Sequence, residues 1–525
     1  MKFFMIGVMS LGCMTLQAQT LPILNPESCT SIMVGKKASA DGSVITSHTC
    51  DSWYRTWMTV EPAMTYERDT TMSVYEGRMH TEFVKDQTGV KFKGTIPQVH
   101  KTYQFLDTAY PCFNEKQLAI GETTISGRKD LVNPKGMFMI EELERLALQR
   151  CTTARGAIHL MGQLIKQYGY GDWGECLTIA DTKEVWQFEV FGEGKDKVGG
   201  VWAAVRIPDD EVGISANIPR ISKLDLSNKN YCMASDNVFD VAKNLGYWDG
   251  KEPFCFWKAY GGGKKAFNIR EYFVLSTLAP SLNLNYDAEE LPFSVKPEKK
   301  LSVWDVIGLL RQTYEGTKWD MMRNLKVENK DPKTQKVDTI ISPAANPWML
   351  PNEVAMLNAQ NKNAVERVRN IAAPQCAYST VIQLRDWLPD AIGGVAWISL
   401  DNPGESPRIP VFCGTMDLPE CYKICGNHRY REDAALWRFR KANKLATVKW
   451  GNAKESLQKS LKYFDEKGQR ELPFVESQYQ SILKNKGEKE AKAFLTGYTA
   501  DFAAAAMLKW DELANKYWFD NKFGF

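Results

Sequence analysis

The chain has 525 residues, of which 44% are apolar, 25% charged and 11% aromatic. This composition supports a large buried core and excludes a chain that is mainly disordered or fibrous. The 66 Lys and Arg residues exceed the 63 Asp and Glu residues by only three charges, so we expect a globular protein without a nucleic-acid partner or an affinity for acidic membrane surfaces.

The first 18 residues have the pattern of an export signal. Lys2 supplies the positive start, an apolar stretch covers residues 3–16, and Ala18 stands at a suitable cleavage position. A buried helix is one alternative, although it would begin at the initiator methionine without a cap. Residues 10–13 resemble a lipoprotein processing site except for Ser10, which leaves lipid anchoring as another alternative. We expect an exported protein, located in the periplasm or outside the cell.

Beyond the signal, no segment has 18 uninterrupted apolar residues, so we predict no membrane-spanning helix. The 12 cysteines are spread too thinly for a disulfide scaffold. Cys421, Cys425 and His428 form half of a metal motif without a second half, which favours a local disulfide or buried thiols. Only five histidines occur, none paired at i, i+4, and we predict no metal centre and no cofactor.

The region from residue 29 to residue 220 alternates strand and helix patterns. Two β-prone segments, residues 29–34 and 43–49, flank a turn with the Asp41-Gly42 signal, which predicts a hairpin. Apolar residues at helical spacing predict two consecutive amphipathic helices over residues 139–146 and 158–165. The other predicted strands cover residues 117–124, 176–180, 185–190, 201–207 and 212–216.

The second half is predicted to add helices and to return once to the sheet. Residues 377–384 and 395–400 are β-prone, and we expect them to join the earlier strands. From about residue 431 the chain is rich in Ala, Lys, Glu and Leu, which predicts a helical cap with a solvated charged face. Helices are also predicted near residues 237–245, 269–278 and 303–314. The resulting division is a signal (1–18), a pro-segment (19–28), a core with insertions (29–430) and a helical C-terminal region (431–525).

Cys29 is the most informative position for function. It opens the first predicted strand, and residues 19–28 separate it from the expected signal cleavage. If cleavage after Ser28 exposes Cys29, one residue supplies a thiol and an α-amine with a pKa of about 7.7–8.0. The amine can then accept the thiol proton, and the thiolate can attack an amide carbonyl. From spacing alone, a buried strand thiol is the simpler interpretation.

Residues 29–52, which begin Cys-Thr-Ser-Ile-Met-Val-Gly and end Cys-Asp-Ser, resemble the start of secreted dipeptidases of the N-terminal-nucleophile hydrolase superfamily. That superfamily also contains penicillin V acylases and bile salt hydrolases. The resemblance implies an α+β fold, an αββα sandwich with the nucleophile at the tip of a central strand. It also implies autoproteolysis by attack of Cys29 on the Ser28 carbonyl through a thioester. Further matching segments are residues 114–124, 171–181, 214–220, 267–270, 278–282, 383–389 and 394–397.

The resemblance also implies roles for single residues. Asp51 matches the family's active-site aspartate, which would orient the amine; by itself it is typical of a solvated strand end. Asn217 matches an asparagine whose N–H donates to the developing oxyanion, and otherwise belongs to a turn. Arg270 matches an arginine beside the nucleophile, whose charge would lower the thiol pKa; an ordinary helix-surface arginine is the alternative.

Two features depart from the family pattern or blur it. Many relatives have arginine three residues before the aspartate, where this chain has His48, which cannot grip a carboxylate in the same bidentate way. This leaves open how His48 takes part in binding a substrate carboxylate. The second oxyanion donor should lie within residues 121–124, where we choose Thr124 or a backbone N–H. Glu122 is our candidate ligand for a substrate ammonium.

We therefore predict an exported cysteine hydrolase that cleaves small peptides, with dipeptides as the expected substrates. One alternative keeps the mechanism and changes the substrate to an N-acyl amide such as a conjugated bile acid or penicillin V. Another is a secreted binding protein that has lost catalysis. The sequence leaves homo-oligomerisation open.

Overall fold

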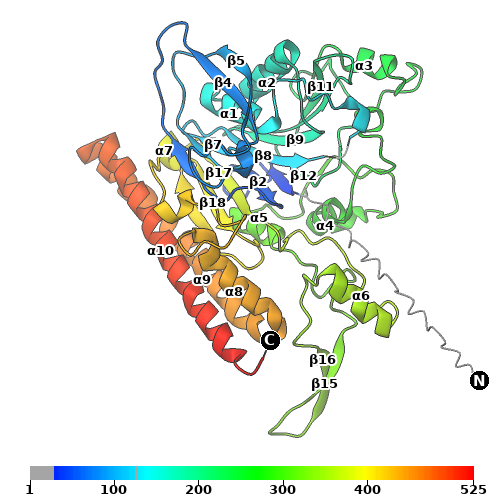
Figure 1. The fold of residues 1–525 in the computed structure, drawn as a ribbon, viewed down its shortest axis with the longest axis vertical. Coiled ribbons are helices and arrows are strands. Elements are labelled where there is room, and N and C mark those ends of the chain that lie inside the picture. The colour runs from blue at the N-terminus through cyan, green and yellow to red at the C-terminus, as the bar shows by residue number, and fades with distance from the viewer. Residues whose placement is uncertain (1–28, 126, 525) are drawn as a thin grey trace, which may run out of the picture.

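The computed structural model describes residues 29–125 and 127–524 (Figure 1). The predicted export signal and pro-segment lie outside the described residues. Two antiparallel sheets form the centre of the molecule. In spatial order the first sheet contains β14 (Ser294–Val295), β12 (Val212–Ser215), β1 (Ser31–Val34), β2 (Val44–Cys50), β17 (Tyr378–Leu384), β18 (Val395–Leu400) and β19 (Ile409–Phe412).

The second sheet packs face to face on the first. Thr46 of the first sheet and Thr178 of the second share a hydroxyl hydrogen bond of 2.6 Å. The sheets approach so closely here that a Cβ on Gly121 would lie 2.4 Å from the carbonyl oxygen of Ser47, so only glycine fits. The second sheet contains β13 (Cys232–Ala234), β11 (Gly200–Arg206), β10 (Val185–Gly192), β9 (Glu175–Ala180), β8 (Ala119–Thr124), β7 (Phe113–Asn114), β6 (Phe105–Asp107) and β3 (Thr59–Glu61).

Helices cover both outer faces, which completes the predicted α+β sandwich (Figure 1). On the second sheet lie α1 (Ile140–Arg150) and α2 (Ala154–Tyr168), in the region where two amphipathic helices are predicted. The first sheet is covered by α4 (Ile269–Leu278) and α5 (Val303–Leu310), and by three helices of the C-terminal region. The latter are α8 (Ala435–Val448), α9 (Trp450–Lys486) and α10 (Glu488–Asp520).

The return to the first sheet is confirmed, because β17 pairs with β2 along its whole length and β18 pairs with β17. The remaining elements lie in the connections. They are the hairpin β4 (Thr71–Glu76) and β5 (Lys91–Pro97), the hairpin β15 (Lys326–Lys330) and β16 (Val337–Ile341), and the helices α3 (Val238–Asn244), α6 (Pro351–Gln360) and α7 (Asp390–Gly393). Short 3₁₀ or π turns cover Arg78–His80, Lys129–Leu131, Trp257–Gly261, Pro280–Leu282 and Glu420–Lys423.

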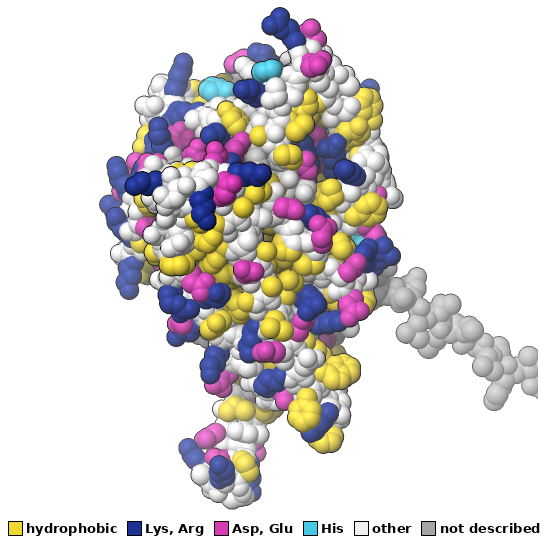
Figure 2. Space-filling view, turned by 90° about the vertical axis from the view of Figure 1, so that its left-hand side faces the viewer, with side chains coloured by type: hydrophobic (Ala, Val, Ile, Leu, Met, Phe, Trp, Pro, Cys, Tyr) yellow, Lys and Arg dark blue, Asp and Glu magenta, His cyan; other side chains and the backbone are white. Residues whose placement is uncertain are grey.

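The surface mixes charges of both signs. On the face shown in Figure 2, Lys and Arg side chains are interspersed with Asp and Glu side chains, which agrees with the small net charge. The narrow projection at the bottom of that view is the hairpin of β15 and β16. Within the described part of the chain, no helix combines the length and the apolar character needed to cross a bilayer.

The described cysteines are free thiols, including Cys421 and Cys425, for which a local disulfide or buried thiols are the sequence-based interpretations. His428 does not turn toward a metal group with them, since its Nε2 lies 2.9 Å from the carbonyl oxygen of Trp53. Cys421, Cys425 and His428 are therefore joined neither by a disulfide nor as a group of metal ligands.

Candidate active site

Cys29 directly precedes β1, an interior strand of the first sheet, and is fully buried. The next residue fixes the chain to β2, because the backbone N–H of Thr30 donates to Thr49 Oγ1 at 2.9 Å and the Thr49 N–H donates to the Thr30 carbonyl at 3.0 Å. The carbonyl oxygen of Cys29 accepts a hydrogen bond of 2.7 Å from Arg270 Nη1. Cys29 thus has a defined position at the tip of a central strand.

Burial raises the pKa of the Cys29 thiol well above its ordinary value, and the negative charges of Glu122 and Asp51 raise it further. The thiol therefore keeps its proton at neutral pH in this arrangement. This rise in the thiol pKa is opposite to the lowering that the sequence resemblance implies for a neighbouring Arg270. The physical reason is that the guanidinium contacts the carbonyl oxygen of Cys29, while desolvation dominates at the sulfur.

Arg270 lies in the first turn of α4 and is 3% exposed, which rules out an ordinary surface arginine. Besides the Cys29 carbonyl, its guanidinium donates to Thr30 Oγ1 at 3.0 Å, to the Ala216 carbonyl at 2.8 Å and to Asn217 Oδ1 at 2.8 Å. Burial, followed by the charge of Arg369, lowers the pKa of Arg270 to about 10, so it stays charged at neutral pH. Arg270 links Cys29 to Asn217.

Asn217 follows β12 with a left-handed backbone, φ 68°, a conformation that asparagine tolerates better than most residues. Its Nδ2 donates to the carbonyl oxygen of Thr124 at 2.6 Å. An amide nitrogen carries two N–H groups, and this bond uses one of them. Thr124 Oγ1 in turn donates to Glu122 Oε1 at 3.1 Å. These contacts bring the predicted oxyanion residues to the end of β8.

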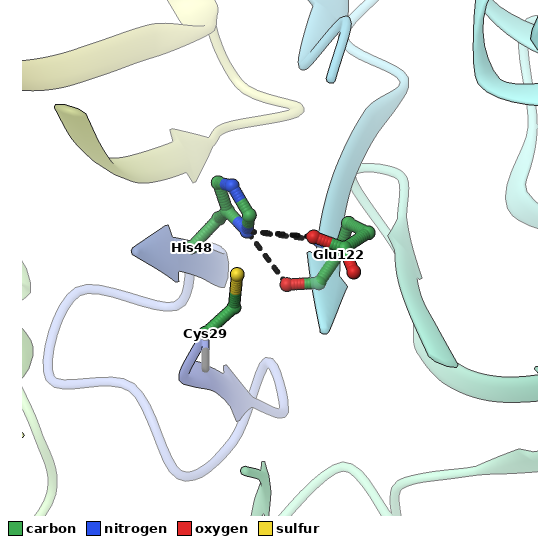
Figure 3. Close-up of side chains that lie close together, drawn as sticks. All are labelled: Cys29, His48 and Glu122. Carbon is green, nitrogen blue, oxygen red and sulfur yellow. Dashed lines mark hydrogen bonds and ion pairs between the residues drawn. The ribbon is translucent and has the colours of Figure 1, made fainter. Parts of the chain in front are cut away.

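His48 on β2 and Glu122 on β8 lie opposite each other between the sheets, with the Cys29 sulfur pointing toward both (Figure 3). His48 Nδ1 lies 2.6 Å from the backbone oxygen of Glu122, and the rings of Tyr110 and Tyr378 lie 5.6 and 5.7 Å from the imidazole. Burial lowers the pKa of His48 to about 4, so the imidazole is neutral at pH 7. It bridges the sheets as a neutral group.

The ligand atoms of Cys29, His48 and Glu122 lie within 4.8 Å of one another, and these residue types can also hold a metal ion. Sequence spacing does not reveal such a group, because its members come from three strands or strand ends. His48 and Glu122 remain predicted substrate-binding residues. Because both are buried, they can also act on a substrate indirectly, through their contacts around Cys29.

Asp51 directly follows β2 and is fully buried, so its interpretation as a solvated strand end is wrong. Its Oδ2 accepts hydrogen bonds from Thr49 Oγ1 at 2.9 Å and from Arg369 Nη2 at 2.8 Å. Sequence reasoning missed Arg369, which lies between α6 and β17 in a segment without a motif. The only hint in the sequence was His48. Where the family pattern expects an arginine three residues before Asp51, this chain has a histidine, so an arginine from another segment could take that place.

Comparisons with known proteins agree on one family. The model of Peptidase family C69 matches residues 28–462. The chain is similar to a "Probable dipeptidase" of Latilactobacillus sakei, 25% identical over 418 residues that cover 75% of this chain and 76% of the relative. It is also similar to a "Probable dipeptidase" of Salmonella dublin, 26% identical over 413 residues, 74% of this chain and 81% of the relative. A "Probable dipeptidase B" of Streptococcus pyogenes serotype M1 is 22% identical over 438 residues, 80% and 79% of the two chains.

Proposed function

Because the chain belongs to peptidase family C69 and is a cysteine-type peptidase, we propose that it is an exported dipeptidase whose nucleophile is Cys29. The environment of Cys29 is the main observation in support of this proposal. Cys29 is buried at the start of β1, its carbonyl is held by Arg270, and Asp51 lies close enough to influence the thiol pKa. The names of the relatives, which are probable dipeptidases, support dipeptides as the substrate class.

In this proposal the chain matures by its own chemistry, as an N-terminal-nucleophile hydrolase related to penicillin V acylases. After export, the Cys29 sulfur attacks the carbonyl carbon of Ser28, and the bond to the Cys29 nitrogen breaks with transfer of the acyl group to sulfur. Water then hydrolyses this thioester. The products are the released pro-segment and a chain that begins with Cys29 and carries a free α-amine.

Turnover uses the same atoms with a peptide substrate. The raised thiol pKa means that a base must take the proton, and the α-amine of Cys29 is that base, oriented by Asp51. The thiolate attacks the substrate carbonyl, and Asn217 with Thr124 or a nearby backbone N–H stabilises the oxyanion. The ammonium returns its proton to the leaving amine, and water resolves the acyl-thioester. Arg270 positions Cys29 and Asn217 throughout.

The test is the intact mass of the exported protein together with its activity. We expect the wild-type mature chain to begin at Cys29 and to hydrolyse dipeptides. Cys29→Ser should slow or block both maturation and turnover, and Cys29→Ala should abolish both. Cys255→Ser, a change at a partly buried thiol outside the candidate site, is the matched control and should behave as wild type.

Three outcomes contradict parts of the proposal. Normal peptidase activity in Cys29→Ala would show that Cys29 is not the nucleophile. A mature chain that begins at Gln19 and lacks activity favours an inert binding protein. Hydrolysis of conjugated bile salts or penicillin V without hydrolysis of dipeptides changes the substrate class while keeping the chemistry.

A further inference from the structure

Two arginine side chains, Arg270 and Arg369, lie close to the candidate nucleophile. Arg270 donates to neutral oxygens of Cys29, Thr30, Ala216 and Asn217. The charge of Arg369 contributes to lowering the Arg270 pKa, which places the two guanidinium groups close together. Asp51 accepts from Arg369 at 2.8 Å. Glu271 and Glu122 are further acids near this group, and their charges act on Arg270 and on the Cys29 thiol, respectively. The two guanidinium groups thus lie close together beside Asp51, and guanidinium groups are well suited to bind carboxylates.

Arg369 is the member of this group that a ligand from solution can reach. Its side chain is 27% exposed, whereas Cys29, Asp51 and Arg270 are at most 3% exposed. Arg369 and Arg367 both line a small surface hollow that also contains Trp348. Arg369 therefore connects the buried site with the surface.

The proposed substrate offers a suitable anion. In a dipeptide, the free carboxylate belongs to the residue that follows the scissile carbonyl, so one residue length of about 3.6 Å separates the attacked carbon from the negative charge. A cation that binds this carboxylate must lie beside the nucleophile, and the guanidinium of Arg369 bonds to Asp51, whose charge acts on the Cys29 thiol. Guanidinium groups match carboxylates in shape and charge.

We propose that Arg369 is a substrate-binding residue that pairs with the free α-carboxylate of a dipeptide and thereby restricts cleavage to the bond next to a C-terminus. This inference rests on the proposed dipeptidase function.

The test compares a set of dipeptides with their C-terminal amides, using the full mature protein. For the wild type, kcat/KM should be higher for the free acids than for the amides. Arg369→Met should lower the ratio of acid to amide kcat/KM by about 10- to 100-fold, the range expected for one hydrogen bond to a charged group. Arg369→Lys keeps the charge without the planar fork and should give an intermediate ratio.

A purely positioning role for Arg369, acting through Asp51, predicts equal losses for acids and amides. An unchanged ratio in Arg369→Met would therefore overturn the proposal. Arg323→Met is the matched control, since Arg323 pairs with Glu366 at the surface at 2.7 Å. Its ratio should equal that of the wild type, and a fall as large as in Arg369→Met would mean that general surface charge selects the carboxylate.

A second measurement uses only the wild type, so it tests the proposal even if the Arg369→Met variant does not mature. Free amino acids should inhibit the wild type competitively, with their amides at least about tenfold weaker, and equal inhibition overturns the subsite. If the wild type is active on dipeptides but fails these tests, the subsite alone is wrong. If the wild type cleaves no dipeptide, the proposed function is wrong and the subsite with it.

Discussion

The side chains proposed to take part in catalysis are deeply buried. The Cys29 thiol, the Asp51 carboxylate and the His48 imidazole are each at most 1% exposed, and burial alone pushes the thiol and the imidazole toward their neutral forms. The neutral forms of these two groups avoid the cost of isolated buried charges. The proposed amine base then creates the thiolate when a substrate carbonyl is present.

Asn217 carries the sharpest prediction for one residue. Asn217→Gly should lower kcat by about 10²–10³, the usual cost of losing one oxyanion donor. Any loss of stability should come from the missing bonds to Thr124 and Arg270, because glycine adopts a φ of 68° without strain. Steady-state kinetics and thermal melts of mature protein measure both effects. Wild-type kcat in this variant would show that the oxyanion donor is another group.

Asn217→Asp separates the donor from the acceptor of the same side chain. An aspartate retains an oxygen for Arg270, which now bonds to Asn217 Oδ1 at 2.8 Å, and it tolerates the left-handed backbone, but it has no N–H to donate. We expect a loss of kcat at least as large as in Asn217→Gly. A much smaller loss would assign the effect to the Arg270 contact.

The contact between helices and sheet depends on a buried polar network near residues 401–406. Asp401 accepts from Arg440 Nε at 2.6 Å and from Asn443 Nδ2 at 2.9 Å, which fastens α8 to the connection after β18. Trp510 of α10 donates through Nε1 to the backbone oxygen of Glu405 at 3.1 Å and to Asn443 Oδ1 at 3.0 Å. These bonds orient the C-terminal helices on the first sheet.

Glu405 in this network should make stability depend on pH. Burial raises its pKa from 4.5 to about 8, so between these values the folded chain binds a proton that the unfolded chain has lost. Stability from this group is present below about pH 4.5 and falls as the pH rises toward 8. Glu405→Gln stays neutral, and relative to wild type it should gain about 1–4 kcal/mol of unfolding free energy between pH 5 and pH 8.5.

Denaturant unfolding at these two pH values measures the Glu405 effect. Glu432→Gln, at an exposed position, is the control and should follow the wild type at both values. If Glu405→Gln changes with pH in parallel with the wild type, the carboxyl group does not titrate in the inferred range.

The hairpin of β15 and β16 should be dispensable for folding. Its residues are almost all exposed, and it projects from the body of the protein (Figure 1). The backbone N–H of Ser342 donates to the Leu325 carbonyl at 2.8 Å at the base of the hairpin, so an Asn-Gly turn can replace residues 326–341. We expect the melting temperature to change by less than about 4 °C, the shift that roughly 1 kcal/mol would cause, with unchanged activity.

A large loss of stability after this deletion would mean that the hairpin packs against another chain. Light scattering of the wild type and the deletion variant would then test homo-oligomerisation, which the sequence leaves open.

The molecule as a whole has a core that crosses the predicted boundary at residue 431. Ile398 and Val411 of the first sheet belong to the same buried cluster as Phe439, Phe502 and Trp510 of the C-terminal helices. Burying one such large side chain stabilises a fold by roughly 1.5–3 kcal/mol. The helical region therefore covers the sheet as an integral layer, and its removal exposes the apolar outer face of β18 and β19.

Truncation after residue 430 should abolish soluble folding. The loss of α8, α9 and α10 removes the partners of that face and exposes an apolar patch of the kind that drives aggregation. The soluble fraction after expression and the cooperativity of thermal unfolding measure the effect, with the hairpin deletion as the control. A soluble chain of residues 29–430 that unfolds cooperatively would contradict this prediction, because it would show that the core folds without the C-terminal helices.

Local pattern was sufficient for most elements of the fold. The hairpin after Cys29, strands β8 to β11 of the second sheet and the helices at residues 140–168 were predicted within a few residues of their ends, because periodicity and turn signals act over short stretches of chain. The other strands of that sheet, β3, β6, β7 and β13, have only two or three residues each and were not predicted. The exposed hairpins at residues 71–97 and 326–341 were missed, since strands without a buried face lack the alternation that marks a strand.

The site itself required long-range folding. Cys29, Asp51, Asn217 and Arg270 were identified by resemblance, but their contacts join residues as far as 241 positions apart, and Arg369 reaches Asp51 across 318 positions. Such contacts follow from strand order and loop path, which no local spacing encodes. The rise in the Cys29 pKa likewise depends on how all neighbouring elements exclude water. Residue types and short-range order are written in the chain, whereas proximity and desolvation arise only when the sheets close on each other.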